Sequence, residues 1–399
     1  MKVTIIGQGY VGLTVALFAS RKFEVIGYDL NTNLVNKLNS GVSHIEGVSD
    51  SMLQEAIRNG KYRASYNGED IDGSDVVVIA VPTPLSKERK PDLTFINDAC
   101  ESIGKHLKNK ALIINESTSF PGTVRRVIKP KIESISGNLG HEYSVSPERV
   151  DPGRSDWNQH NTPRLYSGLS KEANELTRKF YGEFCENLIE VSSPEVAEAA
   201  KLFENTFRQV NIALVNEFAQ IANAINIPVR EVLDAAGTKP YGFMKFNPSA
   251  GVGGHCIPVD PSYLAQAAKE HGVTARFIEL ANEVNLQMGN YIVSRVKQDN
   301  ENSLVGKKVQ LIGVAYKPNV ADVRETPANQ ILEELLMLGA IVSWHDPVVK
   351  NWNGESSAPL GSDIAIVVTK HDQIDEERIL SSSRYVLDTT GKVRGANQL

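Results

Sequence analysis

The chain has 399 residues, enough for two or three domains, and its 41 % hydrophobic and 23 % charged residues are typical of a globular protein. Its 42 basic and 48 acidic residues give a net charge of −6, which argues against nucleic acid or an anionic membrane as a partner. The strongly apolar run from Val76 to Val81 is far shorter than the ~20 residues of a membrane span.

The N-terminal part alternates between strand and helix patterns. Runs of β-branched residues bounded by Gly, Pro or Asp predict strands at Val3–Ile6, Glu24–Tyr28, Val76–Val81 and Leu112–Asn115, with helices at Tyr10–Ser20 and Phe95–Leu107. Such alternation indicates a parallel sheet. Because the first apolar run is too short for a signal peptide, we expect a cytoplasmic protein.

A long helix is predicted in the middle of the chain. Ser193 suits the N-cap and Pro194 the first helical position, and no helix breaker follows until Pro228. At 1.5 Å per residue this helix spans roughly 45 Å, a length suited to linking domains or forming a dimer interface. Helical sequence continues to about Gln298.

The last hundred residues alternate again, with strands expected at Lys308–Val314, Ile341–His345, Ile364–Thr369 and Tyr385–Asp388 and a helix at Pro327–Leu338. We therefore expect an α/β protein with two Rossmann-like, doubly wound domains joined by a helical middle. The expected domains are residues 1–190, 191–300 and 301–399.

A dinucleotide motif lies between the first strand and the first helix. It is the run Gly7, Gln8, Gly9, Tyr10, Val11 and Gly12, in which glycines let the backbone approach a pyrophosphate. Asp29 ends the second strand, where its carboxylate accepts ribose hydroxyls and repels a 2′-phosphate. These features favour NAD over NADP.

Thr83 and Thr118 each follow a predicted strand at the carboxyl edge of the sheet, where open α/β sheets bind ligands. Their hydroxyls either face the cofactor or cap helices.

The loop from Gly251 to Pro261 places a thiol, Cys256, among glycines and prolines. A buried cysteine packs as a small hydrophobe, which we expect for Cys100 and Cys185. Cys256 has no bulky side chains on its N-terminal side, and such a setting suits a nucleophile. His255 is expected to be a turn residue, because adjacent side chains point apart. The three cysteines fit neither a disulfide framework nor a metal site.

Lys201 and Asn205 lie one helical turn apart and are candidate donors to a developing oxyanion, although a single lysine is usually a solvated surface residue. Lys317 and Arg324 lie in the loop after the strand that begins at Lys308. They suit an anionic ligand, or else a charged surface turn with an internal Asp322–Arg324 pair.

Seven motifs stand in order along the chain: GQGYVG, VPTP, EST, SPERVDPG, KLFENTF, GVGGHCIPVDP and YKPNVADVRET. Together they resemble the nucleotide-sugar 6-dehydrogenases, the family of UDP-glucose and UDP-N-acetylhexosamine dehydrogenases, from Met1 to about Asp388. The stretches 238–244 and 277–283 and the Cys256 loop look most like UDP-N-acetylglucosamine 6-dehydrogenases.

The resemblance implies an NAD-dependent, four-electron oxidation of a UDP-sugar through a cysteine thioester. It implies a homodimer paired through the long helix, with NAD on the N-terminal domain and UDP on the C-terminal one. Cys256 corresponds to the nucleophile, Lys201 and Asn205 to the oxyanion pair and Asp260 to a polar helper. Arg324 corresponds to a cofactor contact, and Glu148 lies near the reacting carbon, with Thr118 beside it. The implied substrate contacts are Glu148, Arg149, Val150, Lys201, Asn205, Tyr241, Gly253 and Lys317.

Three positions depart from the UDP-glucose members of that family. Pro152 stands where they carry a second acid, Arg149 follows Glu148, and His255 replaces a small hydroxyl residue. Arg149 is a candidate donor to an acetamido carbonyl, and loss of an acid at Pro152 eases burial of an acetyl methyl group. These departures favour a UDP-N-acetylhexosamine, with the glucosamine, mannosamine and galactosamine forms and UDP-glucose all left open.

Two other classes of protein share part of this pattern, a short-chain epimerase and a sugar-nucleotide sensor. Tyr241 and Lys245 have the four-residue spacing of a short-chain epimerase, but Pro240 and Gly242 argue against a helix there. A sugar-nucleotide sensor without turnover would not need Cys256 together with Lys201 and Glu148.

Overall fold

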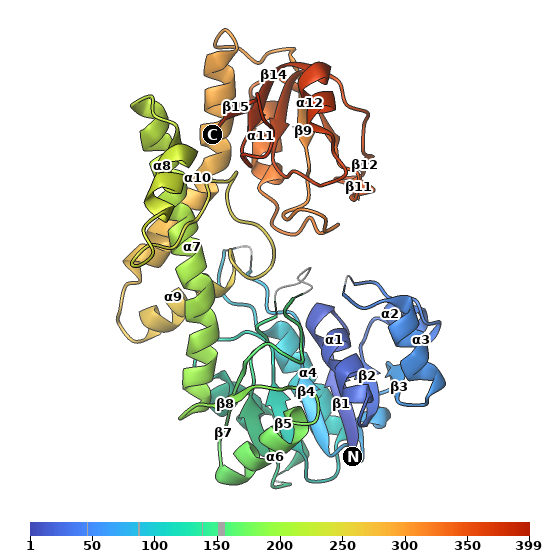
Figure 1. The fold of residues 1–399 in the computed structure, drawn as a ribbon. Helices are drawn as coiled ribbons and strands as arrows, with labels where there is room; N and C mark the ends of the chain where they lie inside the picture. The colour runs from blue at the N-terminus through green and yellow to red at the C-terminus, as the bar shows by residue number, and fades with distance from the viewer. Residues whose placement is uncertain (46, 87, 138, 151–155) are drawn as a thin grey trace. The chain divides into compact units, whose positions relative to one another are not determined.

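The structure, a computed structural model, describes residues 1–45, 47–86, 88–137, 139–150 and 156–399 (Figure 1). It divides into two compact units: residues 1–204 with 266–271, the N-terminal unit, and residues 205–265 with 272–399, the C-terminal unit. The boundary falls inside the long helix α7 (Pro194–Ala224). Pro152 lies outside the described residues, so its effect on substrate choice stays a prediction.

The N-terminal unit is built on an eight-stranded sheet of order β3-β2-β1-β4-β5-β6-β7-β8, parallel except where β6 meets β7. This confirms the parallel sheet expected from the sequence. Its strands are β1 (Lys2–Ile6), β2 (Glu24–Tyr28), β3 (Tyr62–Ser65), β4 (Val76–Ile79), β5 (Leu112–Asn115), β6 (Glu142–Val145), β7 (Arg164–Gly168) and β8 (Leu188–Glu190).

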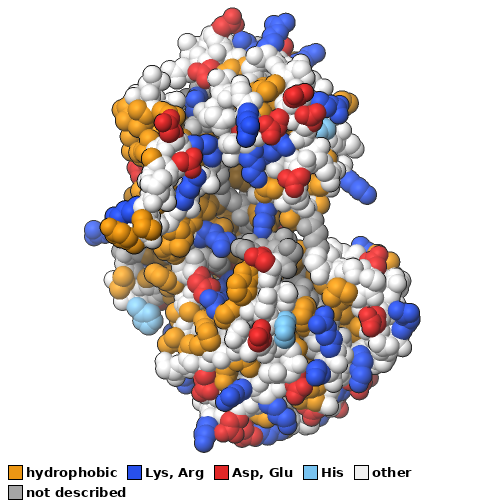
Figure 2. Space-filling model, in the orientation of Figure 1, with side chains coloured by type: hydrophobic (Ala, Val, Ile, Leu, Met, Phe, Trp, Pro, Cys, Tyr) orange, Lys and Arg blue, Asp and Glu red, His pale blue; other side chains and the backbone are white. Residues whose placement is uncertain are grey.

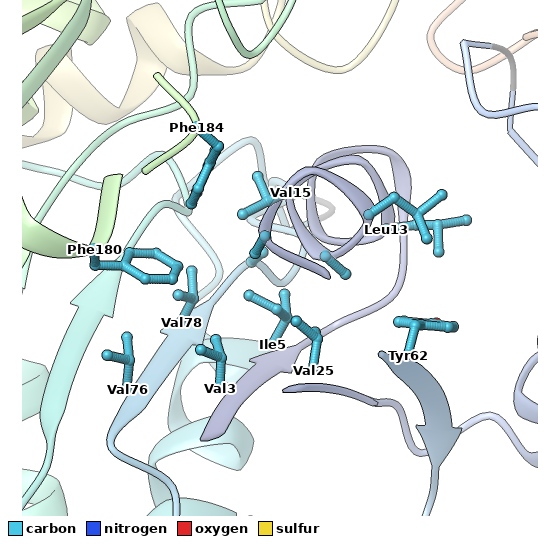
Figure 3. Close-up of a cluster of buried hydrophobic side chains, with 14 of the residues drawn as sticks. Val3, Ile5, Leu13, Val15, Val25, Tyr62, Val76, Val78, Phe180 and Phe184 are labelled. Carbon is cyan, nitrogen blue, oxygen red and sulfur yellow. The ribbon is translucent and has the colours of Figure 1, made fainter. Parts of the chain in front are cut away.

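Helices cover both faces of this sheet, because neighbouring side chains on a strand point to opposite faces. On β1, Val3 and Ile5 belong to the apolar cluster of Figure 3, which includes Leu13 of one helix and Phe180 of another, whereas Ile6 belongs to the cluster on the other face. The first face carries α1 (Tyr10–Ser20), α2 (Thr32–Asn39), α3 (Asp50–Arg58) and α6 (Lys171–Tyr181), and the second carries α4 (Thr94–His106), η1 (Gly68–Ile71), η2 (Val124–Ile128) and α5 (Lys129–Ser136). The doubly wound prediction is confirmed.

The long helix begins as predicted. The Val196 N–H donates to the carbonyl oxygen of Ser193, and Pro194 is the first helical residue. The helix ends at Ala224, and Asn226 then takes a positive φ of 57°. In the C-terminal unit the end of α7 packs on α8 (Val229–Gly237) through an apolar cluster. Two further helices are α9 (Asp260–Glu270) and α10 (Arg276–Asp299).

The C-terminal unit contains a five-stranded, fully parallel sheet of order β10-β9-β13-β14-β15. One face packs on α10 and on α11 (Ala328–Met337), and the other on α12 (Glu376–Ser382), so this half is also doubly wound. The strands are β9 (Lys308–Ile312), β10 (Ile341–His345), β13 (Ser362–Val367), β14 (Ser383–Asp388) and β15 (Asn397–Gln398), with a hairpin of β11 (Asn351–Trp352) and β12 (Glu355–Ser356).

Two properties of the described residues, hydropathy and charge, bear on what a membrane or a strongly charged partner would require. Among the described residues, no helix combines the length and the hydropathy that a membrane span requires. On the face drawn in Figure 2, basic and acidic side chains are interspersed, in keeping with the small net charge. Large apolar side chains are exposed on α7 and α10, for example Leu214, Ile221 and Phe277.

Asp346, just after β10, fixes the loop that follows β9. Its carboxylate accepts hydrogen bonds from Val314 N–H (2.8 Å), from Val349 N–H (3.0 Å) and from His371 Nε2 (3.0 Å). His371 Nδ1 in turn accepts the Asn319 N–H at 2.8 Å, which assigns the ring proton to Nε2. Burial alone would raise the pKa of Asp346, but these donors outweigh it and lower the pKa to about 2.

We expect Asp346→Ala to lower the free energy of unfolding by about 3 to 5 kcal/mol, because several buried donors lose their acceptor. Since the folded-state pKa is depressed, this contribution is present above the unfolded pKa of about 3.9 and is lost as pH falls towards 2. Urea unfolding at pH 7 measures the loss. The control Asp372→Ala, at an exposed side chain bonded to Asn319, should cost under about 1 kcal/mol; equal losses would contradict the assignment.

Candidate active site

The glycine turn joins β1 to α1. Gly7 has φ +88°, and a Cβ on Gly12 would lie 1.8 Å from the Gly7 carbonyl oxygen, so both positions require glycine. A Cβ on Gly9 would meet nothing within 4 Å, and Gly9 is the N-cap of α1 without a side-chain cap. Tyr10 and Val11 form the first turn of the helix. The turn therefore leaves the N-terminus of α1 without a side-chain cap, a geometry that suits the predicted binding of a pyrophosphate.

Asp29 stands beside this turn. Its Oδ2 accepts the Gln8 N–H at 2.8 Å, and its Oδ1 accepts the Asn31 N–H at 2.9 Å. The structure thus brings together the turn and the acid that the sequence separates by some twenty residues. An open helix N-terminus next to a fixed carboxylate fits the pyrophosphate and the ribose of NAD.

Two hydroxyl residues were expected near the cofactor. Thr83 follows β4 and is buried, and Thr118 follows β5 and is half-buried. The alternative that they cap helices is wrong, because α4 is preceded by Leu93 and η2 by Thr123. Between these two strand ends, the hydroxyl of Ser117 in the EST motif accepts the Val81 N–H (2.9 Å) and donates to the Val81 carbonyl (2.8 Å), so it joins the loops after β4 and β5.

Glu148 follows β6, and four donors among the described residues hold its carboxylate. Its Oε1 accepts the N–H groups of Arg149 (2.6 Å) and Val150 (2.5 Å). Its Oε2 accepts from Arg164 Nη2 (2.8 Å) and from the Gln159 amide. Burial would raise the pKa of Glu148, but Arg164, Gln159 and the Val150 N–H outweigh burial and lower it. Glu148 is therefore an anchored anion.

Arg164 also reaches a second acid, which the sequence analysis did not single out. Arg164 Nη1 lies 3.0 Å from Oε1 of Glu116, the residue after β5, and the Tyr181 hydroxyl of α6 donates to the same oxygen. The guanidinium stacks on the Tyr181 ring at 4.4 Å. All three side chains are buried, and burial raises the pKa of Glu116 to about 7.

Lys201 and Arg149 lie in the same unit as Glu148. Lys201 is half-buried rather than fully solvated, and its charge helps to lower the pKa of Glu148. The Arg149 guanidinium is held by Glu204 (2.7 Å) and donates to the Pro163 carbonyl (2.8 Å), so protein partners already take part of its donor capacity.

The three cysteines differ as predicted. Cys100 and Cys185 are buried, and burial raises their pKa values to about 12 and about 11, whereas Cys256 is exposed. The Cys256 carbonyl accepts the Asp260 N–H at 2.8 Å, which places the backbone of Cys256 in the turn that leads into α9. A helix N-terminus favours anionic groups beside it, and this is one of the settings in which proteins use a cysteine as a nucleophile.

The glycines before Cys256 make room for the chain itself. A Cβ on Gly253 would lie 2.7 Å from Tyr316, and one on Gly254 equally close to the Tyr316 ring. At these two glycines the loop after β9 therefore fills the space that a Cβ would occupy, so the packing of the chain itself requires glycine at both positions. Lys317, next to Tyr316, is half-buried.

Arg324 lies close to the thiol. Its carbonyl accepts the Gly254 N–H (3.0 Å), and its guanidinium pairs with Asp322 (2.6 Å), the pair that the surface-turn alternative predicted. Asp322 first, and Cys256 to a smaller extent, raise the pKa of Arg324. Burial and Arg324 lower the pKa of His255, so His255 is neutral near pH 7.

Asp260 and Asn205 form a buried pair in the C-terminal unit, with Asn205 Nδ2 donating to Asp260 Oδ2 at 2.5 Å. Asn205 follows Lys201 by one turn of α7. Tyr241, an expected substrate contact, is exposed beside Lys239. Because α8 ends at Gly237, Tyr241 and Lys245 share no helix, which removes the epimerase arrangement.

The parallel sheet, the glycine turn and Asp29 define a dinucleotide-binding enzyme of the doubly wound class. Sequence profiles of the UDP-glucose/GDP-mannose dehydrogenase family match the chain in three parts: the NAD binding domain over residues 1–185, the central domain over 195–287 and the UDP binding domain over 310–394. The chain belongs to this family and is an NAD-dependent oxidoreductase, which confirms the resemblance seen in the motifs.

Two relatives and one solved structure illustrate the similarity. The chain is 34 % identical to the UDP-N-acetyl-D-mannosamine dehydrogenase of Pyrococcus horikoshii, over 98 % of this chain and 95 % of that protein. It is 37 % identical to the UDP-N-acetyl-D-glucosamine 6-dehydrogenase of Pseudomonas aeruginosa, over 88 % of this chain and 83 % of that protein. The structure of the P. horikoshii UDP-D-ManNAc dehydrogenase superposes with a TM-score of 0.90 at 31 % identity, covering 100 % and 98 %.

Asp29→Ala should lower kcat/KM for NAD about ten-fold or more, because the ribose loses hydrogen bonds to a charged acceptor. Its ratio of NADP to NAD activity should rise, since the 2′-phosphate is no longer repelled. Steady-state kinetics with both cofactors measure this. Asp29→Asn, which keeps the size and removes the charge, should fall between wild type and Asp29→Ala. Comparable kcat/KM values for NAD and NADP in the wild type would overturn the role of Asp29.

Proposed function

We propose that the enzyme oxidises the C6 alcohol of a UDP-N-acetylhexosamine, best UDP-N-acetylglucosamine, to the uronic acid through a thioester on Cys256. The observation that carries the proposal is the exposed Cys256 in the turn that leads into α9, whose first residue, Asp260, accepts a hydrogen bond from Asn205 Nδ2 at 2.5 Å. A sensor without turnover has no use for an exposed thiol in that setting. NAD, when bound, accepts one hydride in each of two oxidations.

The chain's own groups account for the remaining chemistry. In the first oxidation the C6 hydroxyl proton passes to Lys201 or to a water held by Asp260, and the aldehyde that remains at C6 takes up the Cys256 thiolate. Lys201 and Asn205 donate to the resulting alkoxide. The second oxidation leaves a thioester, and water releases the acid and returns the thiol. Because the pKa of Glu148 is lowered, we assign acceptance of the water proton to Asp260 and orientation of the reacting centre to Glu148.

The preference for an N-acetylhexosamine rests on two supports. The P. horikoshii and P. aeruginosa relatives carry names of enzymes for N-acetylmannosamine and N-acetylglucosamine derivatives of UDP. The sequence also has Arg149 and His255 at positions where the UDP-glucose members of the family carry other residues. UDP-N-acetylmannosamine, UDP-N-acetylgalactosamine and UDP-glucose are the alternatives, since these sugars differ from the proposed one at single ring positions.

We further propose that three parts of the chain divide the binding of NAD, the thiol chemistry and the binding of UDP between them. Residues 1–190 bind NAD through Gly7 to Gly12, Asp29, Thr83 and Thr118, with Arg324 as a further cofactor contact. Residues 191–300 supply the thiol, and residues 301–399 bind the UDP moiety, with Lys317 as a contact. Glu148, Arg149, Val150, Tyr241 and Gly253 are assigned to the sugar nucleotide. The exposed apolar side chains of α7 support a homodimer, which we place in the cytoplasm.

Cys256→Ala should lower formation of the uronic acid about a thousand-fold or more, because no thioester forms without the thiol. Chromatography of the product together with NADH absorbance measures this. Cys100→Ala, at a buried thiol away from the site, should keep near-wild-type turnover. Complete conversion to the acid by Cys256→Ala would refute the thioester route.

Among UDP-sugars, UDP-N-acetylglucosamine should have the highest kcat/KM, about ten-fold or more above UDP-glucose, since a pocket for the acetamido group loses hydrogen bonds when the group is missing. A panel of four UDP-sugars assayed by NADH formation tests this ranking. A kcat/KM for UDP-glucose at or above every N-acetylhexosamine would contradict the substrate class while leaving the thiol chemistry intact.

A further inference from the structure

A buried chain of charges links the end of β5 to Glu148. Arg164 donates through Nη1 to Glu116 at 3.0 Å and through Nη2 to Glu148 at 2.8 Å, so one guanidinium serves two carboxyl groups. Arg164 and both acids are less than a tenth exposed. In a buried environment this arrangement couples the two acids, because each competes for the same positive charge.

The charge balance of this cluster decides which acid carries a proton. Among the buried groups of the cluster, ionised Glu148 and Arg164 together are neutral, so ionising Glu116 as well would leave an excess of one buried negative charge. Lys201, which also acts on Glu148, is only half-buried. Glu148 has donors on both oxygens. Glu116 has donors on Oε1 alone, and its buried Oε2 finds no hydrogen-bond partner within the described part of the chain. Glu116 is therefore the acid that takes up the proton.

Groups from several elements around Glu116 bear on its protonation. Arg164 comes from β7, Tyr181 from α6, Cys185 from just after α6, and Glu148 from just after β6. Tyr181 and Cys185 are neutral near pH 7, because burial raises the pKa of each well above that range. The neighbours of Glu116 that carry a charge near pH 7 are thus Arg164 and Glu148.

We propose that Glu116 is a positioning residue for Glu148, and that its protonation sets how firmly Arg164 holds the Glu148 carboxylate. When Glu116 is protonated, the Arg164 charge serves Glu148 alone. When Glu116 loses its proton to solvent, Arg164 is shared, and the repulsion between the two acids raises the proton affinity of Glu148. The proposal rests on the role assigned to Glu148 in the proposed function. The pKa of about 7 for Glu116 places this change near neutral pH.

Infrared difference spectroscopy tests the coupling without turnover. The carboxylic acid band of protonated Glu116, identified by its loss in Glu116→Gln, should disappear as pH rises through neutrality. Glu148→Gln should move that midpoint down by about one pH unit, because a like charge is removed. Glu198→Gln is the matched control: Glu198 is another buried acid, with its pKa raised to about 8, that accepts from Gly122 and Val124 and should leave the midpoint unchanged. An unmoved midpoint in Glu148→Gln would overturn the proposal.

The pH profile of kcat gives the second readout. Glu116→Gln keeps an oxygen acceptor for Arg164 and Tyr181 but cannot ionise, so the profile should lose its inflection near neutral pH while KM changes less than about two-fold. An unchanged profile with a normal rate would contradict the inference and leave the proposed function standing. If the wild type forms no NADH with any UDP-sugar, the proposed function fails, and the infrared midpoints still decide whether Glu116 and Glu148 are coupled.

Discussion

Arg164 is a buried cation between two acids, and the placement of Glu148 in the N-terminal unit depends on it. The strand order β5-β6-β7 brings the residue after β5, the residues after β6 and the first residue of β7 to the same region. Glu116, Glu148 and Arg164 meet there because of that topology. Without the guanidinium, two carboxyl groups would remain buried without a counter-ion, a loss of several kcal/mol. The strand order of the sheet thus determines where Glu148 lies.

In the C-terminal unit, the thiol depends on packing between loops distant in sequence. Gly253 and Gly254 fit against Tyr316. The loop of Tyr316 is held by the side chains of Asp346 and His371, which accept hydrogen bonds from its backbone N–H groups. The neighbouring His255 is neutral, so the setting of Cys256 comes from the start of α9 and from Arg324 rather than from an adjacent base.

The sequence predicted the elements that carry a strong apolar signal and missed those that do not. The strands β1, β2, β5 and β10 fall close to their expected bounds because they are runs of β-branched or large apolar residues. The strands β3, β6, β7 and β8 were not anticipated, since YRAS, EYSV, RLYSG and LIE mix polar and apolar residues without a clear period. Arg164 belongs to such a strand, and only the fold shows its link to Glu116. The glycines before Cys256 were recognised, but their contact with Tyr316 is tertiary.

The central claim is that Cys256 becomes covalently attached to the sugar, and mass spectrometry of the quenched enzyme tests it most directly. Asp260→Asn should slow release of the acid, because the proposed acceptor of the water proton is lost. After mixing this variant with UDP-N-acetylglucosamine and NAD, the peptide that contains Cys256 should gain the mass of the uronyl group as a thioester, and hydroxylamine should remove it. Formation of the acid with no adduct on Cys256 at any time would contradict the account.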